Sequence, residues 1–192
     1  MRGALIVKVK LLAAVWGLLI AVHIANILLH GQLNQYGVIP RSLEHSFHIV
    51  TAAFIHGSWG HLLNNLFGLG VFSAFCLLRS IRFYLLSSVF IILLSGAMVW
   101  VFARSASHIG ASGWVFGLWS LSIAMALFDR SVNNIVIALL LVFFYGGMIY
   151  GVLPTVAQLS YEAHLSGAVA GVICAFFHCV LARNDNANKV CL

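Results

Sequence analysis

Long apolar runs and short polar segments alternate along the whole chain. Six runs approach the roughly 20 residues that a helix needs to cross the hydrocarbon core of a bilayer. Most are bounded by basic residues, by a cluster of polar residues or by proline. This pattern predicts six membrane-spanning helices, at approximately 11–29, 57–78, 83–103, 112–128, 135–153 and 162–182.

The links between these runs leave no room for a separate water-soluble domain. We therefore predict an all-α polytopic membrane protein with one six-helix domain over residues 1–192. Arg2, Lys8 and Lys10 precede the first run, as in a signal sequence, but that run exceeds the roughly 7–15 apolar residues of a cleavable signal. The first run is predicted to remain as a span.

Composition supports a membrane protein and argues against other classes. Charged residues make up 7% of the chain, against about 25% in ordinary soluble domains. The net charge of +6 comes from basic residues at the ends of apolar runs, not from a basic stripe with interleaved aromatics, so we expect no nucleic-acid partner. The four cysteines lack the spacing of a metal site, and no metal or cofactor is expected.

The distribution of lysine and arginine predicts the topology. With both termini in the cytoplasm, eight basic residues fall on the inner side and only Arg41 and Arg104 on the outer side. The second, fourth and sixth spans then all run inward. Their first turns therefore share one depth below the outer surface. The polar residues at this depth are His56, His61, Asn64, Asn65, Ser112 and His164.

Polar residues within spans are candidates for a functional site. A lone serine or histidine there is more often a packing residue, but Ser112 lies between two glycines in Gly110-Ala111-Ser112-Gly113. A hydroxyl becomes a nucleophile when a base takes its proton, and His164 is the best base at that depth. Phe116, one turn after Ser112, is placed to pack against an imidazole.

Glycines predict close approach of the fourth and sixth spans. Gly113 and Gly117 form one small-x-x-x-small face, and Gly167 and Gly171 form another on the same side as His164. The free amide of Ser112 at a helix start, together with His61 and Asn65 on one face of the second span, could donate to an oxyanion. No carboxylate shares a face with His164, so a Ser-His dyad is predicted.

Three motifs resemble the signatures of the rhomboid intramembrane serine proteases. They are His56-x4-His61-x3-Asn65, Gly110-x-Ser112-Gly113 and Ala163-His164-x2-Gly167-x3-Gly171, in that order and on the second, fourth and sixth spans. The resemblance runs from about Thr51 to Gly171. Two positions depart from it. Phe47 and His48 stand where many members carry Trp-Arg, and Phe116 stands where many carry tyrosine.

The resemblance implies a function and assigns roles to residues. Ser112 would be the nucleophile, His164 the general base and acid, and His61, Asn65 and the Ser112 amide the oxyanion hole. His56, Gly110, Gly113 and Phe116 would line the site, with His56 as a structural or water-path residue at its rim. The substrates would be single-span membrane proteins, cut near the outer leaflet of a bacterial-type inner membrane, and the fifth span would be the gate.

Other functions stay open at this point. Metalloprotease and aspartyl protease motifs do not fit, since no carboxylate lies between His56 and His61 and the two aspartates lie at polar boundaries. A metal or haem transporter could use His56, His61 and His164 as ligands. A non-catalytic binder of membrane helices would keep the fold without the chemistry. The oligomeric state and the natural substrate are not predicted.

Overall fold

The computed structural model describes residues 2–154 and 160–190, and this part of the chain is helical without a β-strand. Its only extended pairing is an isolated antiparallel bridge between Val38 and His108. The all-α prediction is thus confirmed. The long helices are α1 (Arg2–Leu28), α3 (Trp59–Arg79), α4 (Ile81–Phe102), α5 (Ser112–Phe128), α6 (Val132–Tyr145) and α7 (Tyr161–Val190). The short ones are η1 (Gln32–Tyr36), α2 (His48–Thr51), η2 (Ala52–Phe54) and η3 (Gly146–Val152).

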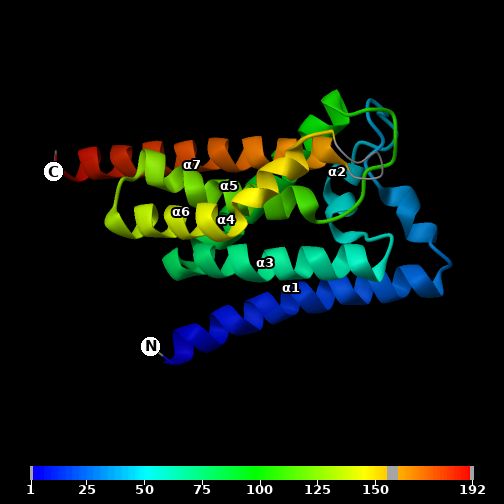
Figure 1. Cartoon of the computed structure of the whole chain (residues 1–192), viewed down its shortest axis with the longest axis horizontal. Coiled ribbons are helices and arrows are strands. Elements are labelled where there is room, and N and C mark those ends of the chain that lie inside the picture. Colours follow the sequence, from blue (N-terminus) through cyan, green and yellow to red (C-terminus); the bar gives the residue numbers. More distant parts are fainter. Residues whose placement is uncertain (1, 155–159, 191–192) are drawn as a thin grey trace.

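The long helices lie roughly side by side and alternate in direction (Figure 1). Helices α3, α5 and α7 all begin at the end of the bundle that carries the irregular segments, and both chain termini lie at the opposite end (Figure 1). Within the described residues, five helical segments are long and apolar enough to cross a membrane, and α5 is a shorter apolar helix. Because α3, α5 and α7 begin at the same end, their first residues lie at one level of the bundle.

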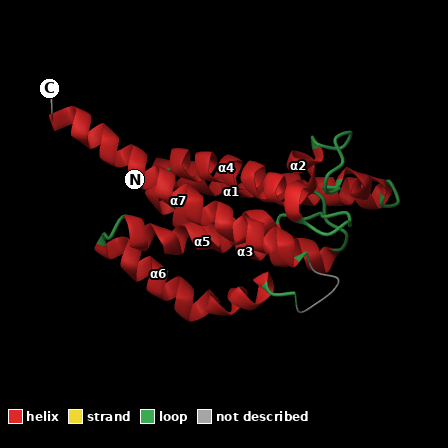
Figure 2. Cartoon of the chain, turned by 90° about the horizontal axis from the view of Figure 1, so that it is seen from above, coloured by secondary structure: helices red, strands yellow, loops and turns green. Residues whose placement is uncertain are grey.

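Helix α5 forms the centre of the bundle. It packs against α3, α4, α6 and α7, and 12 of its 17 residues are buried. Its sequence is apolar on every side, which is typical of a helix surrounded by others. Helix α6 is the opposite case. It lies at the edge of the bundle beside α5 (Figure 2), and only Asn134 and Leu141 are buried within it.

Glycines set the distance between α5 and α7. A Cβ atom added at Gly167 would collide with the main-chain carbonyl of Gly113, and one added at Gly171 would collide with the carbonyl of Gly117. The Ser120 hydroxyl then donates to the Ala168 carbonyl at 2.8 Å. Small residues allow membrane helices to approach until backbone atoms touch, and this close approach fixes the start of α7 beside the start of α5.

Several helix ends differ from the predicted spans. Helix α1 begins at Arg2, before the predicted start at about residue 11, and α7 continues to Val190, beyond the predicted end at about residue 182. The run predicted at 135–153 is divided. It is α-helical to Tyr145 and then tightens into the 3-10 segment η3 at Gly146 and Gly147. Glycine is a weak helix former, and 3-10 turns are common where an α-helix ends.

Arg41 anchors the segment between α1 and α3. Its guanidinium donates to the carbonyls of Val101 at 3.2 Å and Ala103 at 2.8 Å, at the end of α4. His48 is buried, and its Nδ1 donates to the Gly37 carbonyl at 2.9 Å. Phe47 is 57% exposed. An arginine therefore does pack this loop, but from position 41 instead of position 48.

Candidate functional site

Ser112 is the first residue of α5 and follows a tight turn. Gly110 in that turn has a φ of 114°, which side chains rarely tolerate, and a Cβ atom there would collide with the His61 ring. Its amide donates to the Ala52 carbonyl at 2.9 Å, which ties the turn to η2. Glycine is thus required at position 110 for two reasons, the positive φ of the turn and the close approach of α3.

His164 lies in the first turn of α7, and its imidazole is held on two sides. Its ring stacks on Phe116 with 4.2 Å between centroids and 7° between planes. Its Nδ1 atom is 2.8 Å from the carbonyl oxygen of Gly151 in η3. The sequence predicts that Phe116 packs against an imidazole, and in the structure it does so by stacking on His164.

His61 and Asn65 are one turn apart near the start of α3. The Ser58 hydroxyl caps this helix by accepting from the His61 amide at 3.2 Å. The side-chain nitrogen of Asn65 is 3.0 Å from Nε2 of His56. An asparagine amide carries two N–H donors, so one donor of Asn65 remains after this bond.

One cavity of about 370 Å³ brings the predicted reacting groups together. Ser112, His164, His61 and Asn65 all line it, and so does Phe116. These residues come from α3, α5 and α7, which begin at the same end of the bundle. The other lining residues are Asn64, Phe67, Gly68, Phe72, Val115, Tyr145 and Met148.

His56 precedes α3 and lies behind the wall of this cavity, where it is fully buried. Its Nε2 accepts from the Ala111 amide at 3.3 Å as well as from Asn65. Burial, reinforced by the nearby His61, lowers the pKa of His56 to about 4. His56 therefore connects the turn before Ser112 to Asn65 as a neutral acceptor, and it does not lie at the rim.

The carbonyl of His56 is held from α1. Nδ1 of His23 donates to it at 3.0 Å, and the Asn26 amide approaches it at 3.4 Å. His23 and Asn26 are buried polar residues of a helix that is otherwise mostly exposed. Their spacing of three residues puts them on one face of α1, a signal that could have marked them as a polar contact within the bundle.

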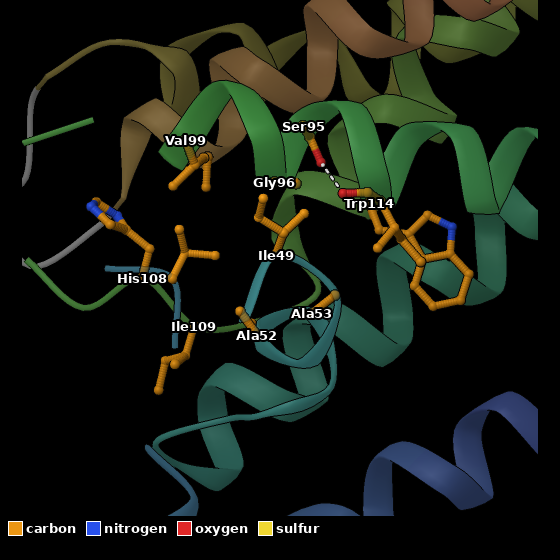
Figure 3. A pocket seen from close by; sticks show the side chains of 14 residues that line it. Ile49, Ala52, Ala53, Ser95, Gly96, Val99, His108, Ile109 and Trp114 are labelled. Carbon is orange, nitrogen blue, oxygen red and sulfur yellow. Dashed lines mark hydrogen bonds between the residues drawn. The ribbon is translucent and has the colours of Figure 1, made fainter. Parts of the chain in front are cut away.

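A second, smaller cavity of about 40 Å³ lies behind the turn that carries Ser112 (Figure 3). Gly110 and Gly113 line this cavity instead of the larger one. Ile49, Val99 and Ile109 contribute apolar side chains, and Ser95 and His108 contribute polar ones (Figure 3). Nδ1 of His108 is 2.6 Å from the Ser160 hydroxyl, so this loop is joined to the segment just before α7.

Sequence reasoning missed several residues of the site. Gly151, Tyr145 and Met148 lie at the end of the fifth apolar run. Nothing in their spacing indicates that Gly151 contacts His164 or that Tyr145 and Met148 line the cavity. The other predicted residues that pack the helices, Gly117, Gly167 and Gly171, lie at the contact of α5 with α7. Within residues 2–154 and 160–190, no three His, Cys, Asp or Glu side chains are grouped as a metal site requires.

Comparison with known proteins identifies the family. Residues 44–180 match the family described as Rhomboid domain. An uncharacterized protein of Mycobacterium tuberculosis is 32% identical over 181 residues, which cover 90% of this chain and 75% of that protein. An uncharacterized protein of Mycobacterium leprae is 27% identical over 181 residues, which cover 90% of this chain and 72% of that protein.

A relative from a plant is similar over a shorter stretch. Rhomboid-like protein 11, chloroplastic, of Arabidopsis thaliana is 32% identical over 157 residues, covering 71% of this chain and 55% of that protein. The family match extends over more than half of the chain and includes α3, α5 and most of α7. The chain belongs to the rhomboid family, as an all-helical integral membrane protein with the fold of an intramembrane protease.

Proposed function

We propose that this protein is an intramembrane serine endopeptidase that uses a dyad of Ser112 and His164. The observation that carries the proposal is the shared cavity, which Ser112, His164, His61 and Asn65 line together. A nucleophile, a base and two oxyanion donors in one cavity are the groups that acyl transfer requires. No cofactor takes part in this chemistry.

The reaction follows from these groups. As the Ser112 oxygen bonds to the scissile carbonyl carbon, its proton passes to Nε2 of His164. The Ser112 amide, His61 and Asn65 donate hydrogen bonds to the oxyanion. The C–N bond then breaks, and His164 gives the proton to the leaving amine. Water attacks the resulting ester with His164 as base, which releases the carboxylate product and the free hydroxyl of Ser112.

The surroundings of the cavity support a membrane-spanning substrate. Its lining is largely apolar, and Tyr145 connects it to a neighbouring apolar groove of about 280 Å³ between α3 and α6. Val71 and Phe75 of α3 and Leu140 of α6 line that groove. We infer that helix α6, exposed at the edge of the bundle, is the gate, and that a single substrate helix reaches Ser112 between α3 and α6.

The charge distribution supports the location. With basic residues concentrated toward the cytoplasm, the ends of α3, α5 and α7 that carry the cavity face outward. The protein would then act at the outer leaflet of a bacterial-type inner membrane. Its partners would be membrane lipid and single-span membrane proteins.

Cleavage by purified variants tests the proposal. Ser112→Ala and His164→Ala should each abolish cleavage of a single-span substrate in proteoliposomes while the thermal unfolding midpoint stays near that of the wild type. Undiminished processing by Ser112→Ala would instead support a helix-binding protein. Stoichiometric zinc or iron in the purified protein that is lost in His61→Ala would support a transporter.

A further inference from the structure

The contact between His164 and Gly151 defines the protonation state of the histidine ring. A main-chain carbonyl oxygen can only accept a hydrogen bond, so Nδ1 of His164, at 2.8 Å, must carry the hydrogen. In a neutral imidazole the other nitrogen is then an unprotonated acceptor. The bond to Gly151 therefore leaves the lone pair on Nε2, the atom that must receive a proton from Ser112.

Stacking alone does not select this arrangement. Phe116 fixes the plane of the His164 ring, with 7° between the two planes. A half-turn about the bond between Cβ and the ring keeps the same plane but exchanges the ring edges. It would move Nδ1 away from Gly151 and displace Nε2. The hydrogen bond to the Gly151 carbonyl distinguishes these two orientations, which the aromatic contact cannot do.

The absence of a side chain at position 151 allows this bond. A Cβ atom there would lie 2.7 Å from Cζ of Phe116 and 3.4 Å from Nδ1 of His164. The backbone of Gly151 does not have a positive φ, so its conformation alone does not demand glycine. The requirement is the close approach of η3 to the stacked rings of Phe116 and His164.

We propose that the main-chain carbonyl of Gly151 is the third member of the catalytic group, a positioning residue that holds His164 in the productive orientation and tautomer. This inference rests on the proposed protease function. In serine proteases with a triad, a carboxylate performs the same task. Here the nearest candidate, Glu162, forms an ion pair with Arg104 at 3.3 Å, and the carbonyl performs the task instead.

The position of Gly151 in the fold adds a consequence. It belongs to η3, which continues directly from α6, the exposed helix at the edge of the bundle. A displacement of α6 to admit a substrate helix would also move the group that orients His164. The base would be set in its productive orientation only when η3 is packed against α7.

The tautomer can be measured without any substitution. Nitrogen-15 spectra of histidine-labelled protein, recorded at about pH 8 where imidazoles are neutral, distinguish protonated from unprotonated ring nitrogens. The His164 signals are assigned by their loss in His164→Asn. We expect a protonated Nδ1 and an unprotonated Nε2. A proton on Nε2, or an equal mixture of the two tautomers, would overturn the proposal.

Two matched glycine variants test the functional consequence. Gly151→Ala should lower kcat between about tenfold and a hundredfold, the scale expected when a catalytic group is slightly misplaced, with little change in KM. Its spectrum should show a mixed His164 tautomer. Gly147→Ala makes the same change in the same 3-10 segment, where an added Cβ meets nothing within 4 Å, and should leave kcat and tautomer unchanged.

The outcomes separate this inference from the proposed function. If the wild type cleaves substrate and Gly151→Ala matches Gly147→Ala in kcat and in tautomer, the role of Gly151 is wrong while the protease stands. If the wild type is as inactive as Ser112→Ala, the protease proposal fails. The tautomer of His164 still reports on the Gly151 bond in that case.

Discussion

At the scale of single residues, His56 supports the proposed site from behind its cavity. Its Nε2 accepts hydrogen bonds from the Ala111 amide and from Asn65. A protonated imidazole could accept neither, because both ring nitrogens would then be donors. The neutral ring thus joins the turn before Ser112 to a proposed oxyanion donor.

This role predicts a dependence of stability on pH. The pKa of His56 is about 4 in the folded protein, against 6.5 for an unperturbed histidine. Between these pH values the unfolded chain binds more protons at His56 than the folded protein does. The contribution of His56 to the free energy of unfolding is therefore fully present above pH 6.5 and is lost as the pH is lowered toward 4. The free energy of unfolding is expected to fall by on the order of 3 kcal/mol across this pH range.

Thermal unfolding in detergent between these pH values measures the effect. His56→Asn should be less stable at neutral pH and should lose less of its stability on acidification than the wild type. His30→Asn is the control, because His30 is exposed and its φ of 52° suits asparagine. An acid-induced loss in His56→Asn as large as in the wild type would contradict the role of His56.

The sequence predicts the proposed reacting residues but not the groups that support them. Ser112 and His164 are marked by glycines at fixed spacing and by equal depth in neighbouring spans. The bond from His164 to Gly151 involves a main-chain oxygen, which every residue has, so no residue type marks it. The same holds for Arg41, because its partners are main-chain carbonyls at the end of α4, which no residue type marks.

At the scale of helices, the contact between α5 and α7 positions Ser112 relative to His164. It depends on backbone atoms that touch at Gly113 and Gly167, and at Gly117 and Gly171. A backbone collision cannot be relieved by rotating a side chain, so the helices would have to move apart. Ser112 and His164 would then separate with the helices that carry them.

Gly167→Ala should therefore destabilise the protein by about 1–3 kcal/mol, the usual effect of overpacking, and should lower activity. Gly17→Ala is the matched control in α1, where an added Cβ meets nothing within 4 Å. Alanine is the better helix former, so this control should leave the unfolding midpoint unchanged or raise it. Equal midpoints for the two variants would show that the close contact of α5 with α7 is not required.

The helices themselves were largely predictable, because length and hydropathy determine which segments can span a bilayer. The predicted start of the fourth span at Ser112 is where α5 begins. The change from α6 to η3 was not predicted. Gly146 and Gly147 weaken an α-helix, which accounts for a change at this point. The direction in which η3 then runs is set by its packing against α7, a tertiary contact that the local sequence does not show.

At the scale of the whole molecule, the proposed function depends on the side of the membrane on which the cavity opens. The basic residues predict cytoplasmic termini, and both termini lie at the end of the bundle opposite to the start of α5 (Figure 1). The two observations agree only if the Ser112 cavity faces outward.

Reporter fusions in a bacterial host test this orientation. Alkaline phosphatase fused after Arg104 should be active, because that enzyme requires the oxidising exterior. The same enzyme fused after Arg130 should be inactive, and a fluorescent protein at the C-terminus should fluoresce. The reversed pattern would place the cavity in the cytoplasm and contradict an outer-leaflet protease.

Covalent modification tests the central claim most directly. Purified wild-type protein treated with a serine-directed phosphonate should gain one adduct, which peptide mass spectrometry should locate at Ser112. His164→Ala should react far more slowly because no base accepts the Ser112 proton, and Ser112→Ala should not react. An adduct that persists in Ser112→Ala, or labelling at Ser112 that is indifferent to His164, would contradict the dyad.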